Sequence, residues 1–332
     1  MKICHLSFFC FLFIFQGFTI DIHAQNKKQK AQQEDNYDDF YDPYEDTYQD
    51  ISWKQKGFEF FVGAGAYFGG KYTANYYNGA FGNTFSLSLL LSNKYRRDSV
   101  LYILKEKYPY IDEEFALDKD WCNTNSKYNV AMDIVLGARY RVAKNWYLEA
   151  SYSFRRVTAE NRFEFIFPGI PDGNNDRRPY SNPQVMGAKE DRHYIDFSVG
   201  YISQNQPVVK PFVAIGGLFT YVRVKSFEVF IEDRRFDLKE MARNPDYVPG
   251  TQVMPNYTDW AGAGYGFSVT AGLKFVVNKS VSLDPLFQLS VASFGNSSIL
   301  KGYNTALGCN YYAGIRLVMS DAVFVKSVKS NQ

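Results

Sequence analysis

The feature that most constrains this chain is a two-residue periodicity that recurs through its C-terminal two thirds. In the stretch 146–155 the even positions are Trp, Leu, Ala, Tyr and Phe, whereas the odd positions include Glu, two Ser and Arg. Side chains on a β-strand point alternately to opposite faces, so such a stretch has one apolar and one polar face. The pattern predicts eight strands, at 57–69, 129–142, 146–157, 191–203, 210–224, 261–277, 281–294 and 306–319.

The connections between these strands alternate between short and long. The short ones are 143–145, 203–209 and 278–280, and the long ones are 70–128, 158–190, 225–260 and 295–305. In bacterial outer-membrane barrels, short turns face the periplasm and long loops face outside. The alternation holds for all seven connections, and it puts both ends of the strand region on the short-turn side.

The N-terminus has the organisation of an export signal. In residues 1–24, Lys2 precedes an apolar stretch from Leu6 to Ile20, and Ala24 precedes the expected cleavage before Gln25. No later run of 18 apolar residues exists, which excludes a helical membrane protein. Residues 25–56 follow as an acidic, tyrosine-rich tail without periodicity, which we expect to be disordered in the periplasm.

Strand length, aromatic strand ends and the alternating connections together resemble the small outer-membrane barrels of the OmpA and OmpX type, and more loosely the barrels of Bacteroidota. The resemblance covers 57–319 as a pattern and not as a motif. It implies an all-β, up-and-down antiparallel transmembrane barrel in the bacterial cell outer membrane, with both termini periplasmic. Residues 320–332 depart from it, because such barrels commonly finish on an aromatic residue and here a C-terminal tail follows the last strand.

The first long connection, 70–128, contains a segment that could be read in two ways. Residues 85–91 alternate as a strand would, and if 81–92 crossed the membrane, a ten-stranded barrel would follow. Residues 98–108 predict a short amphipathic helix, capped by Asp98 or Ser99 and ended by Pro109. We interpret the connection as a folded extracellular lobe that contains a helix.

The polar face of the predicted strands carries balanced charge. An eight-stranded barrel is only wide enough for side chains to fill it, and buried charges must be paired. We therefore expect a salt-bridged plug in the lumen. Its acids are Glu59, Asp133, Glu149, Asp196 and Asp284, and its bases are Arg139, Arg141, Arg155, Lys274 and Arg316.

Two cysteines, Cys122 and Cys309, remain after cleavage of the signal. Cys309 opens the last strand at its outer end and Cys122 closes the first long connection, so we predict a disulfide between them. Two free thiols are the alternative. Without a CxxC motif or a nearby histidine, no metal site is expected, and no sequence pattern indicates a cofactor.

An enzymatic role is not expected. Some small barrels modify lipid A with a serine and a histidine, and the mature chain has one histidine, His193. Its parity points it to the lipid side, whereas Ser153 on the neighbouring strand points inward and Ser181 lies in the adjacent loop. Nothing in this spacing secures the nucleophile–base contact that catalysis needs.

The favoured function is that of a non-enzymatic scaffold or accessory subunit of a larger outer-membrane assembly for secretion, uptake or barrel insertion. Long loops on a rigid scaffold usually carry function, and the tail 25–56 offers a second contact surface. The expected partners are outer-membrane lipid or lipopolysaccharide and other outer-membrane or periplasmic proteins. The formal net charge of +2 gives no case for nucleic acid.

Two alternatives stay open, an adhesin that binds a ligand through its loops and a lipid A-modifying enzyme. In addition, the sequence Asp98-Ser99-Val100 resembles the short O-glycosylation acceptor motif of Bacteroidota.

Overall fold

The computed structural model describes the strand region and most of the first and third long connections. The described residues are 57–80, 85–109, 111, 115–117, 126–167, 180–206, 208–244, 246–247, 260–278, 280–293 and 307–320. The expected signal 1–24, the tail 25–56 and residues 321–332 lie outside them.

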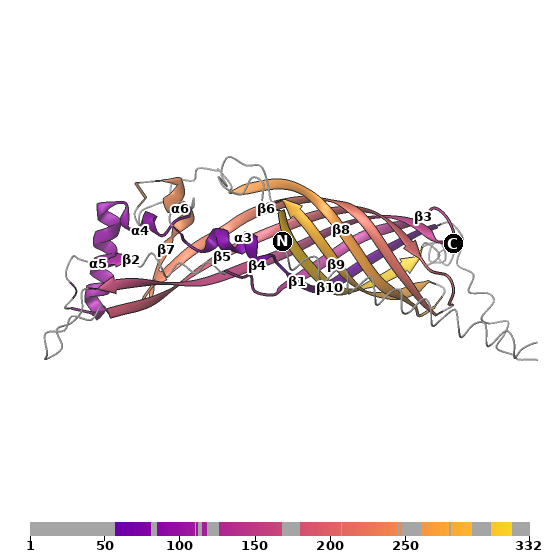
Figure 1. Ribbon diagram of the computed structural model, residues 1–332, viewed down its shortest axis with the longest axis horizontal. Helices are drawn as coiled ribbons and strands as arrows, with labels where there is room; N and C mark the ends of the chain where they lie inside the picture. The colour runs from indigo at the N-terminus through magenta and orange to yellow at the C-terminus, as the bar shows by residue number, and fades with distance from the viewer. Residues whose placement is uncertain are drawn as a thin grey trace, which may run out of the picture. The chain divides into compact units, whose positions relative to one another are not determined.

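Eight strands form a closed antiparallel ring, which confirms the predicted fold (Figure 1). Each strand pairs with the next along the chain, and the first pairs with the last, so the sheet is an up-and-down barrel without free edges. The ring strands are β1 (Gly57–Phe68), β3 (Ala131–Arg141), β4 (Trp146–Phe167), β5 (Tyr180–Ile202), β6 (Val209–Ile231), β8 (Ala261–Val276), β9 (Val281–Ser293) and β10 (Leu307–Ser320).

The two faces of the ring have the polarity that the alternation predicts. Large apolar side chains point outward and are exposed, among them Met132 (67%), Ile215 (66%) and Phe267 (72%). The ten predicted plug residues are all buried inside the ring. A sheet with an apolar exterior and a charged interior suits a lipid solvent, because closure of the ring leaves no open strand edge in contact with lipid.

Strands β4, β5 and β6 continue well beyond the predicted ends (Figure 1). The sequence placed 158–190 and 225–260 in loops, whereas β4 runs on to Phe167, β5 begins at Tyr180 and β6 runs to Ile231. This part of the prediction was wrong. The extended portions form a sheet with two short strands, β2 (Ala116–Leu117) beside β4 and β7 (Arg234–Asp237) beside β6.

The polarity of the sheet reverses along these three strands. On β4 the inward side changes from Glu149 and Arg155 to Phe163 and Phe165, all buried, while the outward side now carries the exposed Glu160. An outward polar face and an inward apolar face are what a sheet in water requires. The reversal therefore marks the level at which β4, β5 and β6 leave the membrane.

A β-bulge in β6 accompanies the change. Lys189 pairs with Ser226 and Glu190 pairs with Val224, which leaves Lys225 as an extra residue. The inward residues of β6 consequently have even numbers up to Val224 and odd numbers from Phe227 onward. A bulge shifts the alternation of inward and outward side chains by one residue. The strand predicted from the sequence, 210–224, ended at this shift.

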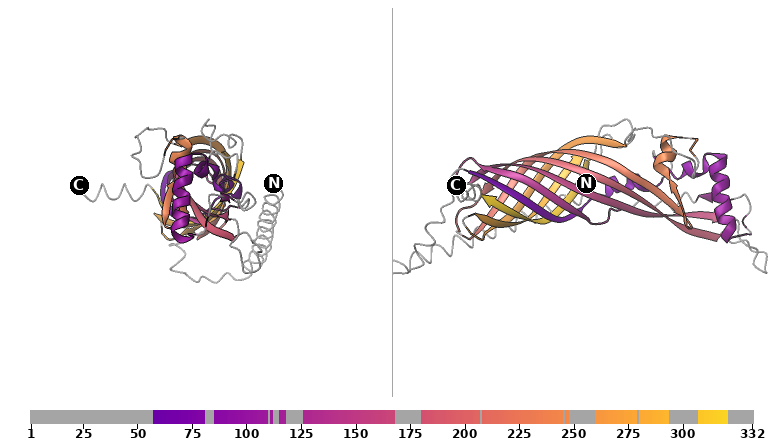
Figure 2. Two further views of the ribbon diagram at one scale, coloured as in Figure 1. Left: turned by 90° about the vertical axis from the view of Figure 1, so that its left-hand side faces the viewer. Right: turned by 180° about the vertical axis from the view of Figure 1, so that it is seen from behind.

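Helices pack on the apolar side of this extended sheet and form what we call the lobe (Figures 1 and 2). Its described residues are 70–80, 85–109, 111, 115–117, 157–167, 180–190, 224–244 and 246–247. The helical elements are α3 (Lys71–Ala74), the 3-10 turn η1 (Asn75–Tyr77), α4 (Ser88–Leu91), α5 (Lys94–Lys107) and α6 (Leu238–Arg243). None of the helices in the described part of the chain has the length and apolar character needed to cross a bilayer.

The structure resolves the ambiguous segment and corrects the helix start. Residues 88–91 are helical, so the ten-stranded alternative fails. The predicted helix begins at Lys94 and not at Asp98, because the Asn93 side chain caps it by accepting a hydrogen bond from the Tyr95 backbone amide. It ends at Lys107, one residue before the predicted end, and Pro109 follows it as predicted.

Candidate functional site

The lumen near the short turns is filled by one connected ion-pair network. Arg139 lies at its centre, 3.0 Å from Glu149, 3.2 Å from Asp284 and 3.5 Å from Glu59. Glu59 also contacts Lys274 Nζ at 2.8 Å and Arg141 Nη2 at 2.8 Å. Because each carboxylate meets at least one cation, the network can remain charged in the barrel interior.

A further cation, Arg316, joins the network through Glu149. Its Nη1 lies 2.6 Å from Glu149 Oε1, and its guanidinium stacks on the Phe61 ring, with 4.6 Å from Cζ to the ring centroid. The structure therefore brings together seven of the predicted plug residues at one level of the barrel. They are Glu59, Arg139, Arg141, Glu149, Lys274, Asp284 and Arg316.

Asp133 and Arg155 form a separate pair nearer the lobe, with Arg155 Nε 2.9 Å from Asp133 Oδ2. The Arg155 guanidinium lies between two tyrosine rings, 4.1 Å from the Tyr194 centroid and 4.3 Å from that of Tyr67. The two tyrosine hydroxyls are 3.0 Å apart. Arg155 and the two tyrosines thus form an aromatic layer across the lumen, between the charged network and the lobe.

Asp196 departs from the prediction. In the described part of the chain it is held by hydrogen bonds from uncharged side chains, Ser268 Oγ and Gln288 Nε2, the latter at 3.1 Å, and by no ion pair. Counting inward charges could not reveal this, because pairing depends on which strands lie opposite one another. Asp196 and Ser268 come from strands that both pair with β6.

Sequence reasoning missed a further buried pair at the lobe end of the lumen. Arg192 contacts Glu190 at 2.6 Å and donates to the Tyr67 hydroxyl at 3.0 Å, while the Tyr128 hydroxyl donates to Glu190 at 3.1 Å. The even parity that places Tyr194 inward also places Arg192 and Glu190 inward. Extending that parity below residue 194 would have identified both.

His193 lies on the lipid-facing side of β5, where its parity placed it. Its Nδ1 is 2.7 Å from the Tyr152 hydroxyl, and its ring packs against Phe154 and Tyr221, with centroid separations of 5.2 and 5.8 Å. Ser153 is buried on the lumen side of β4. Ser181 belongs to β5, in register with Ile166, and not to a loop as the sequence suggested.

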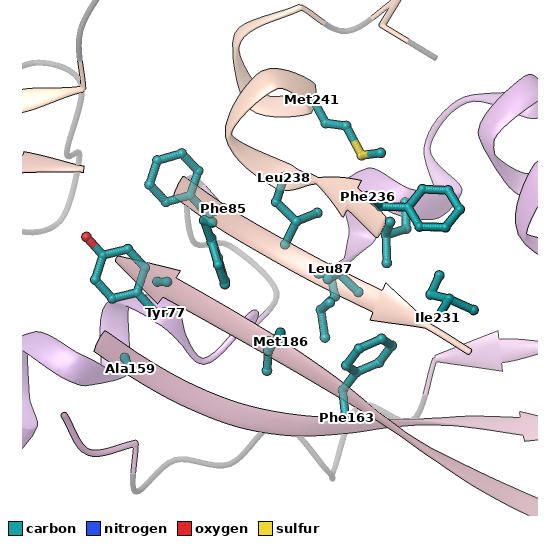
Figure 3. Close-up of a cluster of buried hydrophobic side chains, with 14 of the residues drawn as sticks. Tyr77, Phe85, Leu87, Ala159, Phe163, Met186, Ile231, Phe236, Leu238 and Met241 are labelled. Atoms are coloured by element: carbon teal, nitrogen blue, oxygen red, sulfur yellow. The ribbon is translucent and has the colours of Figure 1, made fainter. Parts of the chain in front are cut away.

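The lobe has a hydrophobic core of its own (Figure 3). Phe85 is fully buried, and its ring contacts those of Tyr76, Phe227 and Trp260, with centroids 5.4, 5.6 and 4.9 Å apart. From α6, Leu238 and Met241 face the same cluster (Figure 3). This core makes the lobe a folded unit above the lumen.

Two side chains of α5 make polar contacts that tie the lobe together. The fully buried Arg96 of α5 donates to the backbone carbonyls of Leu89, Asn244 and Tyr247 at 3.0, 2.9 and 2.5 Å. At the β6–β7 turn, Lys107 of α5 donates to Glu232 at 2.5 Å. Both side chains thereby join α5 to the third long connection, and Arg96 also joins it to α4 through Leu89.

The outer side of α5 is open to solvent. Tyr95 and Tyr102 are each 71% exposed, and the half-buried Ser99 lies between them and donates to the Tyr95 carbonyl. Residues seven apart lie on one side of a helix, so the two tyrosines form one exposed aromatic strip. Figure 2 shows α5 at the far end of the extended sheet, across the axis of the barrel.

The predicted disulfide stays a prediction, because Cys122 lies outside the described residues. Cys309 is half-buried on β10, and its carbonyl lies against Gly70, which begins the first long connection. Among the described residues, no group of three or more His, Cys, Asp or Glu side chains could hold a metal ion.

No protein-family model matches the chain, and no curated protein matches it. Among solved structures, Neisserial surface protein A is 12% identical, with 78% of this chain and 96% of that chain covered at a TM-score of 0.35. The attachment invasion locus protein Ail of Yersinia pestis, solved with the heparin analogue sucrose octasulfate, is 8% identical (79% and 99% covered, TM-score 0.31). OprG from Pseudomonas aeruginosa is 12% identical (80% and 97% covered, TM-score 0.32).

The closed ring, the apolar exterior and the charged interior make this chain an outer-membrane β-barrel protein of bacteria.

Proposed function

We propose that the barrel is a non-conducting anchor whose lobe acts outside the cell as the docking surface of a scaffold or accessory subunit in a larger outer-membrane assembly. The observation that carries the proposal is the lobe itself, a folded unit with its own core built directly on three barrel strands. An anchor alone does not require such a structure, and folded elements on a rigid scaffold commonly carry function.

The packed lumen supports the absence of transport. The ion-pair network, the aromatic layer and the lobe core succeed one another along the barrel interior. In planar bilayers we expect no stable conductance in the nanosiemens range. A steady open channel would contradict a closed barrel.

The exposed strip of Tyr95 and Tyr102 is the best candidate for the contact with a protein partner. Tyrosine is enriched at protein interfaces, and well-exposed aromatic pairs on one helix face are suited to burial against another surface. Affinity purification of the full chain from native membranes should recover a stoichiometric partner. The double change Tyr95→Ser/Tyr102→Ser should release that partner.

The matched control is Lys94→Ser/Lys105→Ser on the same helix, which should retain the partner. Recovery of a lone monomer that still binds a surface ligand would favour an adhesin over a subunit. We also propose that the protein is not an enzyme, since His193 is engaged by Tyr152 and Ser153 faces the lumen. A His193→Ala change that altered lipid A acylation would overturn that view.

The outward direction of the lobe has its own test. A cysteine placed at Tyr102 should react with a membrane-impermeant maleimide on intact cells, whereas one at Gln204, in a short turn, should react only after the outer membrane is opened. The opposite pattern would place the lobe in the periplasm.

A further inference from the structure

A row of aromatic side chains marks the membrane boundary on the β4–β5–β6 side of the barrel. Tyr152, Phe154, His193 and Tyr221 all face outward, and His193 contacts the other three rings. Amphipathic aromatic residues collect at the level of lipid head groups, where one end of the ring is in contact with lipid and the other with water. The hydrogen bond between Tyr152 and His193 gives this row its polar component.

Immediately beyond the aromatic row, the outward positions become basic. Arg156 on β4 and Arg223 on β6 are the register partners of Asp191 on β5, one on each side of it. Lys189 is the next outward residue of β5, and Lys225 is the extra residue of the β6 bulge. We call these five residues the boundary cluster, in which one carboxylate and four basic residues occupy neighbouring register positions of three strands.

The carboxylate holds two of these cations in place. Arg156 donates to Asp191 through Nε at 2.7 Å and Nη2 at 3.2 Å, and Lys225 Nζ lies 3.5 Å from the same carboxylate. Asp191 is 8% exposed, whereas the side chains of Arg156 and Lys225 are 60% and 40% exposed. The acid is thus covered, and the two cations present their remaining N–H groups outward.

We propose that the boundary cluster binds the sugar-linked phosphate of an outer-leaflet glycolipid of the lipid A type. Adjacent strands lie about 4.8 Å apart, so Arg156 and Arg223 flank Asp191 over about 10 Å, a span that suits a head group lying across the three strands. Guanidinium groups bind phosphate oxygens through paired hydrogen bonds, and exposed cations at head-group level attract anionic lipid. The aromatic row below would receive the sugar–acyl junction of the same molecule.

The bulge has a specific role in this arrangement. It puts Lys225 and Ser226 in succession toward the outside, opposite the single residue Lys189. Bulges commonly re-aim a side chain at a functional position. Here the bulge adds a cation to the outer surface at the level where the sheet changes from lipid to water.

The inference rests on the proposed outward direction of the lobe, because lipid A occupies only the outer leaflet. The test uses the refolded full chain in detergent, titrated by native mass spectrometry with bisphosphorylated lipid A, with the same lipid after removal of both phosphates, and with phosphatidylglycerol. We expect clear preference for the bisphosphorylated form.

The double change Arg156→Gln/Lys225→Gln should raise the dissociation constant roughly 10- to 30-fold, and Lys189→Gln, which leaves the Asp191 contacts in place, by roughly 3- to 6-fold. The control Arg234→Gln/Arg235→Gln removes two exposed cations from β7 and should change it less than about twofold. Retained heat-modifiable migration in gels shows that each variant is folded.

Three results would overturn the proposal: equal binding of the dephosphorylated lipid, equal loss in the β7 control, or phosphatidylglycerol binding as tightly as bisphosphorylated lipid A. The labelling at residue 102 separates these failures from an error in the orientation of the lobe. If residue 102 is labelled from outside and the barrel shows no preference for phosphorylated lipid, only the proposed lipid site is wrong.

Discussion

The ring of Tyr147 lies directly over Gly200, its cross-strand partner between β4 and β5. A Cβ at residue 200 would overlap the Cζ, Cε2 and hydroxyl of that ring, so the glycine is what lets the tyrosine lie across the lumen. Arg139 stacks on the same ring, with 4.4 Å from its Cζ to the ring centroid. The position of Arg139, the central cation of the network, therefore depends on residue 200 being a glycine.

From this contact we predict that Gly200→Ala destabilises the barrel by about 1–3 kcal/mol, the usual cost of overpacking. The matched control is Gly217→Ala, because a Cβ there has no neighbour within 4 Å. Urea unfolding in detergent micelles, followed by gel mobility, measures both. Equal midpoints for the two variants would contradict the packing argument.

Arg139 should be the most sensitive residue of the lumen. It contacts three carboxylates, so Arg139→Met leaves Glu59, Glu149 and Asp284 with less counter-charge, at an expected cost of about 3–5 kcal/mol. The double change Arg139→Met/Glu149→Gln should recover part of that loss, because it removes one of the uncompensated charges. Thermal unfolding of the single and double variants gives the comparison, and strictly additive losses would show that the two side chains do not interact.

The lobe should be able to unfold while the barrel stays folded. Phe85 is fully buried among four aromatic rings, and Phe85→Ala should destabilise the lobe by about 3–5 kcal/mol. Limited proteolysis should then cut within 70–117 while the heat-modifiable barrel persists. Tyr102→Ala, a change of the exposed α5 surface, serves as the control and should leave the protease pattern unchanged.

The β6–β7 turn should respond to acid. Partial burial raises the pKa of Glu232, but hydrogen bonds from Lys107, Asn182 and Gln184 outweigh it and hold the pKa below its ordinary value. A carboxylate with a lowered folded-state pKa stabilises the lobe at neutral pH. That contribution begins to fall as the pH approaches the ordinary glutamate value of about 4.3 and is lost below the folded-state pKa.

Hydrogen exchange of residues 182–186 and 228–236, corrected for intrinsic rates, should therefore accelerate between pH 6 and pH 3 in the native chain. Glu232→Gln should remove most of this pH dependence. Glu232→Gly should remove it too, while relieving the left-handed backbone of this residue, whose φ is 53°. Unchanged acid sensitivity in both variants would assign the effect to other groups.

The disulfide between Cys122 and Cys309 remains a prediction with a direct chemical test. Mass spectrometry of the native protein, alkylated without reductant, should find neither thiol modified. If both are alkylated, the bond does not exist. The bond would fix the end of the first long connection to the last strand, with a stabilisation of roughly 3–5 kcal/mol on the chain-entropy model.

The alternation of side chains was enough to predict the eight strands and the direction of their faces, because lipid outside and packed charge inside impose one rule on every strand. It failed where that rule ceases to apply. Beyond Val157 and Val224 the apolar side is the inner one, and in β6 the phase also changes by one residue. The sequence pattern consequently predicted loops where β4, β5 and β6 continue as strands.

For the candidate site, sequence could place charges on the inner face but not pair them. Asp133 meets Arg155 because β3 and β4 lie side by side in that register, while Asp196 meets Ser268 across a strand. The start of α5 was misplaced because Asn93 caps it as Asp98 or Ser99 could have done. Such choices depend on tertiary contacts that the local pattern does not contain.

The reversal of polarity in β4, β5 and β6 also fixes how deep the protein sits. If the barrel moved inward by one pleat repeat of two residues, Arg156 would enter the hydrocarbon. There a cation near the midplane costs about 2–4 kcal/mol of stability, and less toward the surface. If it moved outward, Phe154 and Tyr221 would leave the lipid and expose apolar area to water. The same three strands thus set the depth of the barrel in the bilayer, and they keep the lobe at a fixed distance from the membrane surface.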